Sequence, residues 1–431
     1  MESLTWWFEA AVNLLVILTT VVLGATAVLT LSWALYAWRT PAGYDDTKFQ
    51  RDSGPVRRLR FSLLVPARHE EAVLGHTLDR LAQTEHPDVE ILAIVGHDDP
   101  GTTRVAQEAA QRHPGLIRVV VDHSWPKNKP KGLNTALEQV TGDVVGVFDA
   151  EDDVAPGLLP AIERCFHHDA ADVVQGGVQL MNIHSSWWAL RNCLEYFFWF
   201  RSRLHFQADR NFIPLGGNTV FVRTPLLRAV GGWDAECLAE DCELGVRLSS
   251  VGARVSVAYD PALATREETP GDLQGLVKQR TRWDQGFIQV YRKGIWRRLP
   301  IGRRLLAWYT LMTPMLQAFS GLVIPLSLAF MLLAKTSVVV ALLGFLPAAL
   351  LFASVVVEVV ALREFGLVYG VRIRLRDYFG LVVGTLPYQW LLAAAAVRAV
   401  WRELRNERGW EKTAHVGAHV TQPASELSKA A

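Results

Sequence analysis

The chain has 431 residues, half of them hydrophobic, and a formal net charge of +1 at neutral pH. This balance of charge argues against a general nucleic-acid-binding protein, which would carry a basic excess. The length allows two or three units, each with its own core. The four cysteines form no CxxC pair, so we expect reduced thiols rather than a disulfide framework.

The N-terminal segment 10–38 contains no charged residue and exceeds the ~20 residues that a helix needs to cross a bilayer. Only Glu2 and Glu9 precede it as charges, whereas a cleaved signal peptide begins with positive charge. We therefore predict an uncleaved anchor over 1–40. The basic linker that follows, 41–60, places the rest of the chain in the cytosol by the positive-inside rule.

From residue 61 apolar strand patterns alternate with amphipathic helical patterns, which predicts parallel βαβ units. The carboxyl ends of such strands meet at one edge of the sheet, where ligands bind. No GxGxxG motif follows the first strand, so we expect no dinucleotide cofactor. A later strand is predicted over 172–180. Polar residues that follow the strands, and are therefore expected at this edge, are Arg68, His69, Glu70, His97, Asp98, Asp99, Asp122, Asp149 and Glu151.

Two short stretches carry most of the charge expected at this edge. The stretch 146–153 reads GVFDAEDD, and carboxylates one residue apart can share a divalent cation whose shell is completed by substrate phosphates. The alternative is a solvated acidic turn. Lys127, Asn128, Lys129 and Lys131 precede a helix expected to begin near Lys131, and cations at a helix N-terminus suit a diphosphate. A basic loop is the alternative there.

Five motifs then occur in a fixed order: PARHEE, KPKGLN, FDAED, LAEDCE and QRTRW. Together they resemble family 2 glycosyltransferases with a GT-A fold, most of all the membrane-embedded cellulose, chitin, hyaluronan and poly-N-acetylglucosamine synthases. The resemblance covers roughly residues 61–290. It implies an α/β GT-A domain with a Rossmann-like mixed sheet, cytosolic and embedded between transmembrane helices, with amphipathic interfacial helices.

The resemblance also implies roles for particular residues. Asp149 and Glu151 correspond to the family's metal motif for Mg²⁺ or Mn²⁺, with Glu in place of the usual second Asp. Asp241 corresponds to the catalytic base, with Glu240 beside it; the alternative is that Asp241 only caps a helix. HDDPGT departs from the usual DDGSxD, so either Asp98 or Asp99 would contact the nucleotide. The implied donor site is Arg68, Glu70, Asp98, Asp99, Lys129 and Asp149, and the implied acceptor site is Gly217, Asn218, Gln279, Arg282 and Trp283.

The remaining segments predict contacts with a membrane. The segment 185–206 is rich in aromatic residues and arginines, and we expect it at the membrane interface, since its arginines need water or lipid headgroups. A buried core helix is the alternative. Three apolar spans follow, at 305–334, 336–357 and 378–397, and Glu358 is expected to pair with Arg363. The arginines of the aromatic segment 185–206 are Arg191, Arg201 and Arg203.

The predicted units after the linker are a nucleotide-sugar-binding half (61–165), an acceptor half (166–300), a three-helix transmembrane block (301–401) and a tail (402–431). Three crossings would place the tail outside, yet its basic residues predict a cytosolic tail. Either one span is re-entrant or the rule fails in this chain.

The sequence thus predicts an inverting, metal-dependent glycosyltransferase, multi-pass in a bacterial-type inner membrane. It would move a hexose from a nucleotide sugar, UDP-linked by expectation, to a growing β-linked polysaccharide, with coupled translocation. Two alternatives remain open. One is an enzyme that adds a single sugar to a membrane lipid. The other is an inactive membrane scaffold or sugar-binding protein.

Overall fold

The computed structural model describes residues 2–39, 58–333, 338–339, 342, 346–407, 409 and 411. Most of the predicted linker, most of the predicted tail and part of the predicted span 336–357 lie outside these residues. The four cysteines form no disulfide bonds with one another, and all four are buried.

A seven-stranded sheet forms the centre of the α/β domain, in the order β3-β2-β1-β4-β7-β5-β8. Its first four strands are parallel, as the alternating pattern predicts. β7 runs antiparallel between β4 and β5, which makes the sheet mixed. The strands are β1 (Phe61–Ala67), β2 (Val89–Gly96), β3 (Ile117–Asp122), β4 (Val144–Val147), β5 (Val173–Gly176), β7 (Val220–Arg223) and β8 (Val255–Ala258).

The prediction of a single strand over 172–180 is wrong in one respect, because the strand divides after Gly176. β6 (Val178–Leu180) leaves the main sheet and pairs with β9 (Thr265–Glu267). A Cβ at Gly176 would lie 2.5 Å from the Thr219 side chain, so the chain passes very close to its neighbour where it changes sheets. Glycine permits such an approach.

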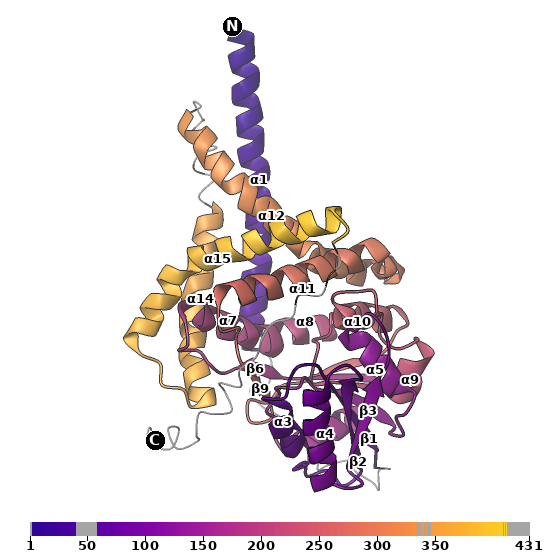
Figure 1. The fold of residues 1–431 in the computed structure, drawn as a ribbon. Helices are drawn as coiled ribbons and strands as arrows, with labels where there is room; N and C mark the ends of the chain where they lie inside the picture. Colours follow the sequence, from indigo (N-terminus) through magenta and orange to yellow (C-terminus); the bar gives the residue numbers. More distant parts are fainter. Residues whose placement is uncertain are drawn as a thin grey trace.

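Helices cover both faces of the sheet, and alternation along the strands divides the core between them. Leu63 and Val65 of β1 pack against α3, α4 and α6, whereas Leu64 packs on the other face against α5, α9 and α10. Figure 1 shows these layers below the long helices. Their bounds are α3 (Leu74–Leu81), α4 (Pro100–Arg112), α6 (Leu158–His168), α5 (Lys129–Leu137), α9 (Thr224–Ala229) and α10 (Glu240–Ser250).

The aromatic, arginine-rich segment forms α7 (Trp187–Phe198), the π-helix η1 (Trp199–Arg203) and α8 (Leu204–Ala208). Two of its arginines are buried inside the protein. Arg191 is 6% exposed and pairs with Glu358 at 2.6 Å, and Arg201 is 4% exposed and pairs with Glu364.

This pairing corrects two expectations. Arg191 and Arg201 need neither water nor headgroups, because carboxylates of α14 (Leu346–Tyr369) neutralise them inside the protein. Glu358 pairs with Arg191 rather than with Arg363. A buried charge is tolerated when an opposite charge satisfies it, and the sequence did not show that α14 packs on α7.

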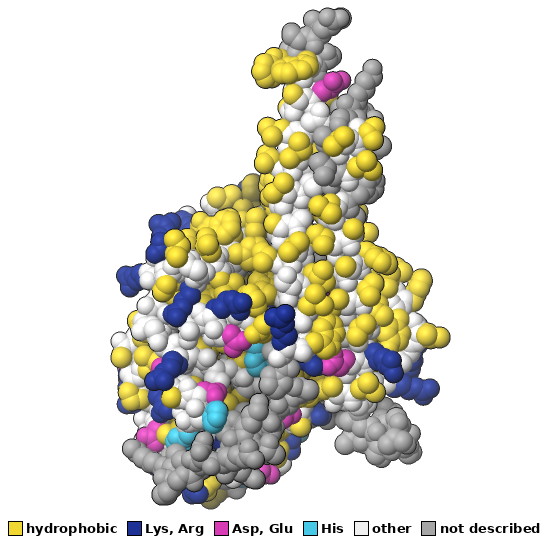
Figure 2. Space-filling model, turned by 180° about the vertical axis from the view of Figure 1, so that it is seen from behind, with side chains coloured by type: hydrophobic (Ala, Val, Ile, Leu, Met, Phe, Trp, Pro, Cys, Tyr) yellow, Lys and Arg dark blue, Asp and Glu magenta, His cyan; other side chains and the backbone are white. Residues whose placement is uncertain are grey.

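Three stretches of the described residues are long and apolar enough to cross a membrane: Trp6–Tyr36, Ile301–Leu326 and Leu375–Leu404. In Figure 1, α1 and the far part of α12 project from the domain, whereas α15 runs across their base. Figure 2 shows hydrophobic side chains covering the projecting helices, with Lys and Arg concentrated below them. The helices are α1 (Glu2–Tyr36), α12 (Ile301–Leu333) and α15 (Leu375–Leu404).

The helix α11 (Leu273–Lys293) joins the α/β domain to these long helices, packing against α10, α12 and α15. Its closest approach to the start of α10 is at Gly286. A Cβ there would lie 2.4 Å from the Ala239 Cβ and 2.6 Å from the Ala239 backbone nitrogen. Because backbone atoms cannot turn aside, this contact fixes the position of α11 relative to α10.

We expect Gly286→Ala to destabilise the protein by about 1–3 kcal/mol, the usual range for forcing a methyl group into a packed contact. Thermal unfolding in detergent measures the change. Gly275→Ala, in the same helix, is the control, because its nearest contact would be an ordinary 3.4 Å. Equal unfolding temperatures for the two variants would contradict the close packing.

Candidate active site

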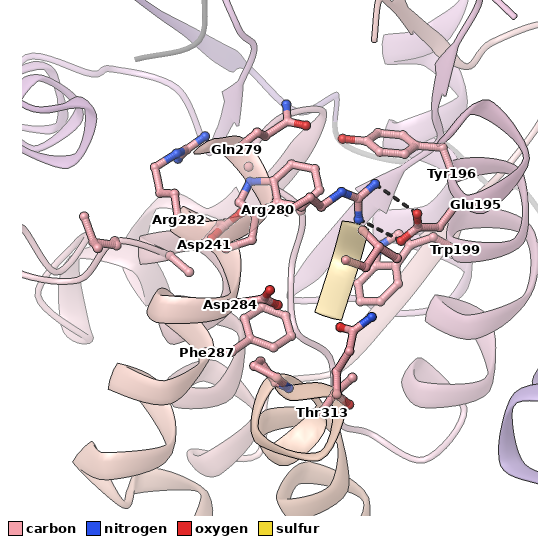
Figure 3. A pocket seen from close by; sticks show the side chains of 18 of the residues that line it. Glu195, Tyr196, Trp199, Asp241, Gln279, Arg280, Arg282, Asp284, Phe287 and Thr313 are labelled. Carbon is pink, nitrogen blue, oxygen red and sulfur yellow. Dashed lines mark hydrogen bonds and ion pairs between the residues drawn. The ribbon is translucent and has the colours of Figure 1, made fainter. Parts of the chain in front are cut away.

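A single large cavity of about 1370 Å³ lies at the carboxyl edge of the sheet. One end is lined by residues that follow β1 and β4 and by the starts of α5 and α10. The other end is lined by residues of α1, α12, α14 and α15. Figure 3 shows the middle of this cavity, where side chains of α7, α10, α11 and α12 converge.

Lys129 is the central cation of the sheet end. Asn128 caps α5 by accepting a hydrogen bond from the Lys131 backbone nitrogen at 3.0 Å, so the helix begins two residues before the predicted start. The ammonium group of Lys129 pairs with Asp149 and donates to the Gly217 carbonyl at 2.8 Å. Burial alone would lower the pKa of Lys129, but Asp149, Glu240 and Asp241 raise it above its usual value.

The other predicted cations bind backbone carbonyls, although Lys127 also lines the cavity. Lys127 donates to the carbonyl of Asp122 at 2.7 Å, and Lys131 donates to the carbonyl of Pro126 at 3.0 Å. Both therefore hold the loop that precedes α5. Of the basic cluster, Lys129 is the residue brought to the acidic stretch.

The carboxylates of the acidic stretch 146–153 have two different structural environments. Asp152 is fully buried and accepts hydrogen bonds from the Asp149 backbone nitrogen at 2.8 Å and from the Asn218 amide at 3.0 Å, so it fixes the turn. Asp149 and Glu151 line the cavity. Burial, followed by the charges of Asp149 and Glu267, raises the pKa of Glu151 well above its usual value.

This unfavourable crowding of carboxylates fits a divalent cation, which would relieve it. The described residues contain no group of three His, Cys, Asp or Glu side chains arranged to hold a metal. Asp149 and Glu151 would thus provide two ligands, and the remainder would come from water and substrate phosphates.

Asp241 lies in the first turn of α10, close to Lys129 and Gly217. Its Oδ1 accepts from the Cys242 backbone nitrogen at 2.7 Å, and its Oδ2 is 3.2 Å from where a Cβ on Gly217 would be. The N-cap of α10 is Ala239, so the alternative that Asp241 merely caps the helix is wrong. Burial raises the pKa of Asp241, as suits a proton acceptor, while Lys129 and Arg282 lower it.

Glu240 precedes Asp241 and is only 4% exposed. Burial first, and then the charge of Asp241, raises the pKa of Glu240 to about 7. Two adjacent carboxylates with raised pKa values make this helix start the strongest candidate for the proton-accepting site.

The predicted nucleotide contacts are only partly assembled around the cavity. Arg68 and Glu70 line it, and Arg68 pairs with Asp98 at 3.1 Å. Asp99 caps α4 and accepts from the His69 backbone nitrogen at 2.6 Å, which holds the loop after β1. Neither Asp98 nor Asp99 is among the described residues that line the cavity. Their contact with a nucleotide stays a prediction.

The predicted acceptor residues come from two places. Gln279, Arg282 and Trp283 lie on α11 and line the cavity. Figure 3 labels Gln279 and Arg282. Gly217 lines it as well, through the carbonyl that Lys129 binds. Asn218 donates its amide to Asp152 and Glu267, so it organises the acidic stretch, and its contact with an acceptor stays a prediction.

Sequence reasoning missed a polar network behind Trp283. The Arg280 guanidinium carbon lies 4.7 Å from the centre of the Trp283 ring. Arg280 also pairs with Glu195 at 2.7 Å, and Figure 3 shows this pair. The Tyr388 hydroxyl also donates to Glu195, at 2.8 Å. Arg280 lies inside the QRTRW motif, but Glu195 and Tyr388 lie about a hundred residues to either side, and no local pattern connects them.

Comparison with known proteins identifies the family of the chain. The profile of a family described as "glycosyltransferase like family 2" matches residues 58–286, which is more than half of the chain. The chain belongs to glycosyltransferase family 2.

Two kinds of curated relatives illustrate the range of the family. A β-monoglucosyldiacylglycerol synthase of Synechocystis is 28% identical over 246 residues, which is 56% of this chain and 50% of that protein. A poly-β-1,6-N-acetyl-D-glucosamine synthase of Staphylococcus epidermidis is 25% identical, over 54% of this chain and 56% of that protein. This glycosyltransferase thus spans about half the length of the curated relatives it matches.

Among solved structures, the mannosyltransferase PcManGT of Pyrobaculum calidifontis, in complex with GDP-Man and Mn²⁺, aligns with a TM-score of 0.59 at 18% identity. The alignment covers 92% of this chain and 99% of that one. This similarity confirms the GT-A fold predicted from the motifs.

The raised pKa of Glu240 predicts how stability depends on pH. A carboxyl group whose pKa is higher in the folded state favours folding below its unfolded value of about 4.5, and this contribution is lost as the pH rises through about 7. Glu240→Gln removes the ionisation. We expect its unfolding temperature to exceed that of the wild type more at pH 8 than at pH 5.

Thermal scans at both pH values measure this difference. Glu236→Gln, which alters an exposed acid four residues earlier, should show no such dependence. A pH-independent difference for Glu240→Gln would mean that Glu240 does not ionise in this range.

Proposed function

We propose that this glycosyltransferase moves a hexose from a nucleoside diphosphate sugar to a hydroxyl group of a membrane lipid, with inversion at the anomeric carbon. The observation that carries the proposal is the continuity of the cavity, which joins Asp149 and Asp241 to the apolar helices. A lipid acceptor would place its hydroxyl at one end and its acyl chains at the other.

The wall at the helical end suits acyl chains. Apolar side chains of three helices contribute to it, although polar residues such as Thr26, Gln317 and Ser320 also line it. A growing glycan would need polar groups and aromatic faces along its whole length. We therefore favour the lipid acceptor over the polysaccharide favoured from the sequence. The lining residues that support this choice are Leu23, Ala27, Ile324, Pro325, Leu351 and Val355.

The reaction is a single displacement. The acceptor hydroxyl oxygen attacks the anomeric carbon, its proton passes to Asp241, and the bond from that carbon to the diphosphate oxygen breaks. Lys129 stabilises the negative charge that develops on the departing nucleoside diphosphate. Mg²⁺ or Mn²⁺ held by Asp149 and Glu151 would neutralise the same charge.

The position of α15 supports a catalytic domain and C-terminal segment on the same side of the membrane. Near its start, Asp377 lies 3.6 Å from His184. Near its end, Glu403 pairs with Arg292 at 2.5 Å. A helix attached at both ends to one domain lies along the membrane surface rather than across it. With α15 at the surface, the predicted spans 305–334 and 336–357 would be the two crossings after the domain, which is consistent with a basic tail in the cytosol.

Polysaccharide elongation is the second candidate, because Trp283 and the QRTRW motif provide an aromatic face for an acceptor sugar. One assay separates the candidates. Purified protein in lipid nanodiscs is incubated with Mn²⁺ and each of a panel of labelled UDP- and GDP-hexoses, and the products are sized. A labelled lipid carrying one sugar supports the proposal, a polymer supports elongation, and no product with any donor supports an inactive scaffold.

In the same assay, Asp241→Asn should lower transfer at least ~10²-fold, the lower end of what a positioned base contributes. Nucleotide affinity, measured by calorimetry, should persist, because Asn can still accept from the Cys242 nitrogen. Asp272→Asn, at the N-cap of α11, is the control and should stay active. An active Asp241→Asn enzyme would remove Asp241 from the mechanism.

Asp149→Asn should abolish transfer and reduce the gain in nucleotide affinity on adding Mn²⁺, since one anionic ligand is lost. The matched control is Asp153→Asn, because Asp153 pairs with Arg80 at 2.7 Å and does not line this cavity. Titrations with and without Mn²⁺ measure the effect. If both variants respond to Mn²⁺ as the wild type does, the acidic stretch holds no metal.

A further inference from the structure

Arg203 differs from the other arginines of the α7–η1 segment. Its guanidinium carbon lies 4.1 Å from the centre of the Trp33 ring and 4.7 Å from that of Trp199. Among the residues that the structure describes, no carboxylate lies within ion-pairing distance of Arg203, and its buried Nε has no acceptor. By contrast, Arg191 and Arg280, which line the same cavity, pair with Glu358 and Glu195.

The local backbone presents Arg203 to the cavity. η1 is a π-helical turn, a feature that is frequent at functional sites. Within it Arg203 stands close above Trp199, and the adjacent Ser202 hydroxyl donates to the Trp33 carbonyl of α1. Arg203, Trp33 and Trp199 all line the cavity; Trp199 is labelled in Figure 3.

The chemistry of this position favours an anion. The two indole rings lie against the guanidinium and accept no hydrogen bonds in its plane, so its N–H groups need acceptors at its edge. Burial lowers the pKa of Arg203 to about 10, so it remains charged at neutral pH. Arg203 is half-buried, and Glu195, which lies beyond ion-pairing distance, offsets its charge only in part, so a bound anion would be favourable. A planar guanidinium binds phosphate through two parallel hydrogen bonds.

The surroundings indicate what carries that anion. Beside Arg203, the cavity wall continues along α1 at Thr26 and Thr30 and along α12 at Tyr309 and Thr313. Further along, the wall includes Leu23 and Ala27 of α1 and Ile324 of α12. A ligand at this position would therefore combine a negative group with a part that extends between the helices. A phosphate-bearing lipid has this composition.

We propose that Arg203 binds the phosphate of the acceptor lipid, and that the acceptor is a phospholipid with a free headgroup hydroxyl. This inference rests on the proposed lipid transfer. A phosphate oxygen acting as the nucleophile would need no base. The role proposed for Asp241 as a base therefore implies that the nucleophile is a hydroxyl group. The phosphate is thus the anchor, and the hydroxyl beyond it is the reacting group.

The test compares two acceptors in mixed micelles, dioleoylphosphatidylglycerol and the neutral dioleoylglycerol, with the donor that supports transfer. Arg203→Gln should raise the KM for the phospholipid at least tenfold and leave the KM for the donor unchanged. Arg203→Lys should show an intermediate KM, because it keeps the charge and loses the planar fork. Arg210→Gln is the matched control, since Arg210 also stacks on a ring, that of Phe206, but does not line the cavity.

Three results would overturn the inference. Equal losses of transfer to both acceptors in Arg203→Gln would mean that Arg203 only docks α1. Preference of the wild type for dioleoylglycerol would mean that no phosphate is recognised. Competitive inhibition by inorganic phosphate that depends on Arg203, without preference for the phospholipid, would indicate a site for free anions.

Native mass spectrometry separates failure of this inference from failure of the proposed function. If no lipid accepts sugar, the proposed transfer fails. Retention of phosphatidylglycerol that is lost in Arg203→Gln, but not in Arg210→Gln, would still support the phosphate site. Equal retention by all variants would overturn it.

Discussion

The organisation of the site depends on one ammonium group among several carboxylates. Lys129 pairs with Asp149 and is close enough to Glu240 and Asp241 for their charges to raise its pKa. Without it, these acids would face one another in a buried space, which is strongly unfavourable. Its bond to the Gly217 carbonyl also joins the acidic stretch to the loop before β7. The first half of the sheet is thereby tied to the second half, and Asp149 and Asp241 are brought to one cavity.

A second set of charges links this site to the long helices. Arg191 and Arg201 are satisfied by α14, and the Glu195 carboxylate holds Arg280 of α11 and the Tyr388 hydroxyl of α15. Each pair joins the α7–η1 segment to an element more than 80 residues away. Separating the partners of a buried ion pair destabilises a protein, because each charge is then left buried and unpaired. These contacts therefore fix the positions of α11, α14 and α15 around Trp283. The helices are therefore part of the walls of the active site.

The sequence predicted what local pattern determines. Alternating apolar strands gave β1 to β4 and their parallel order, and the motifs gave the GT-A fold and the convergence of Lys129, Asp149 and Asp241 on one cavity. It could not predict the pairs Arg191–Glu358 and Arg280–Glu195, because these depend on how distant helices pack. For the same reason the arginines of residues 185–206 were expected at lipid headgroups. The positions of Asp98 and Asp99 outside the cavity also depend on loop geometry, which the motif HDDPGT does not encode.

The N-terminal helix α1 packs against the rest of the protein and contributes to the cavity wall. Trp33 is 6% exposed, contacts Tyr309 of α12 at a ring distance of 5.5 Å, and accepts a hydrogen bond from Ser202 through its carbonyl. Residues of α1 from Leu23 onward also line the cavity. A helix near the start of the chain thus helps to line the cavity that also contains Asp241, the proposed base, some 200 residues later. Cutting the protein back to its α/β domain would keep Lys129, Asp149 and Asp241 together but would open the acceptor end of the cavity. Donor hydrolysis by such a fragment would therefore reveal nothing about which acceptor the intact enzyme uses.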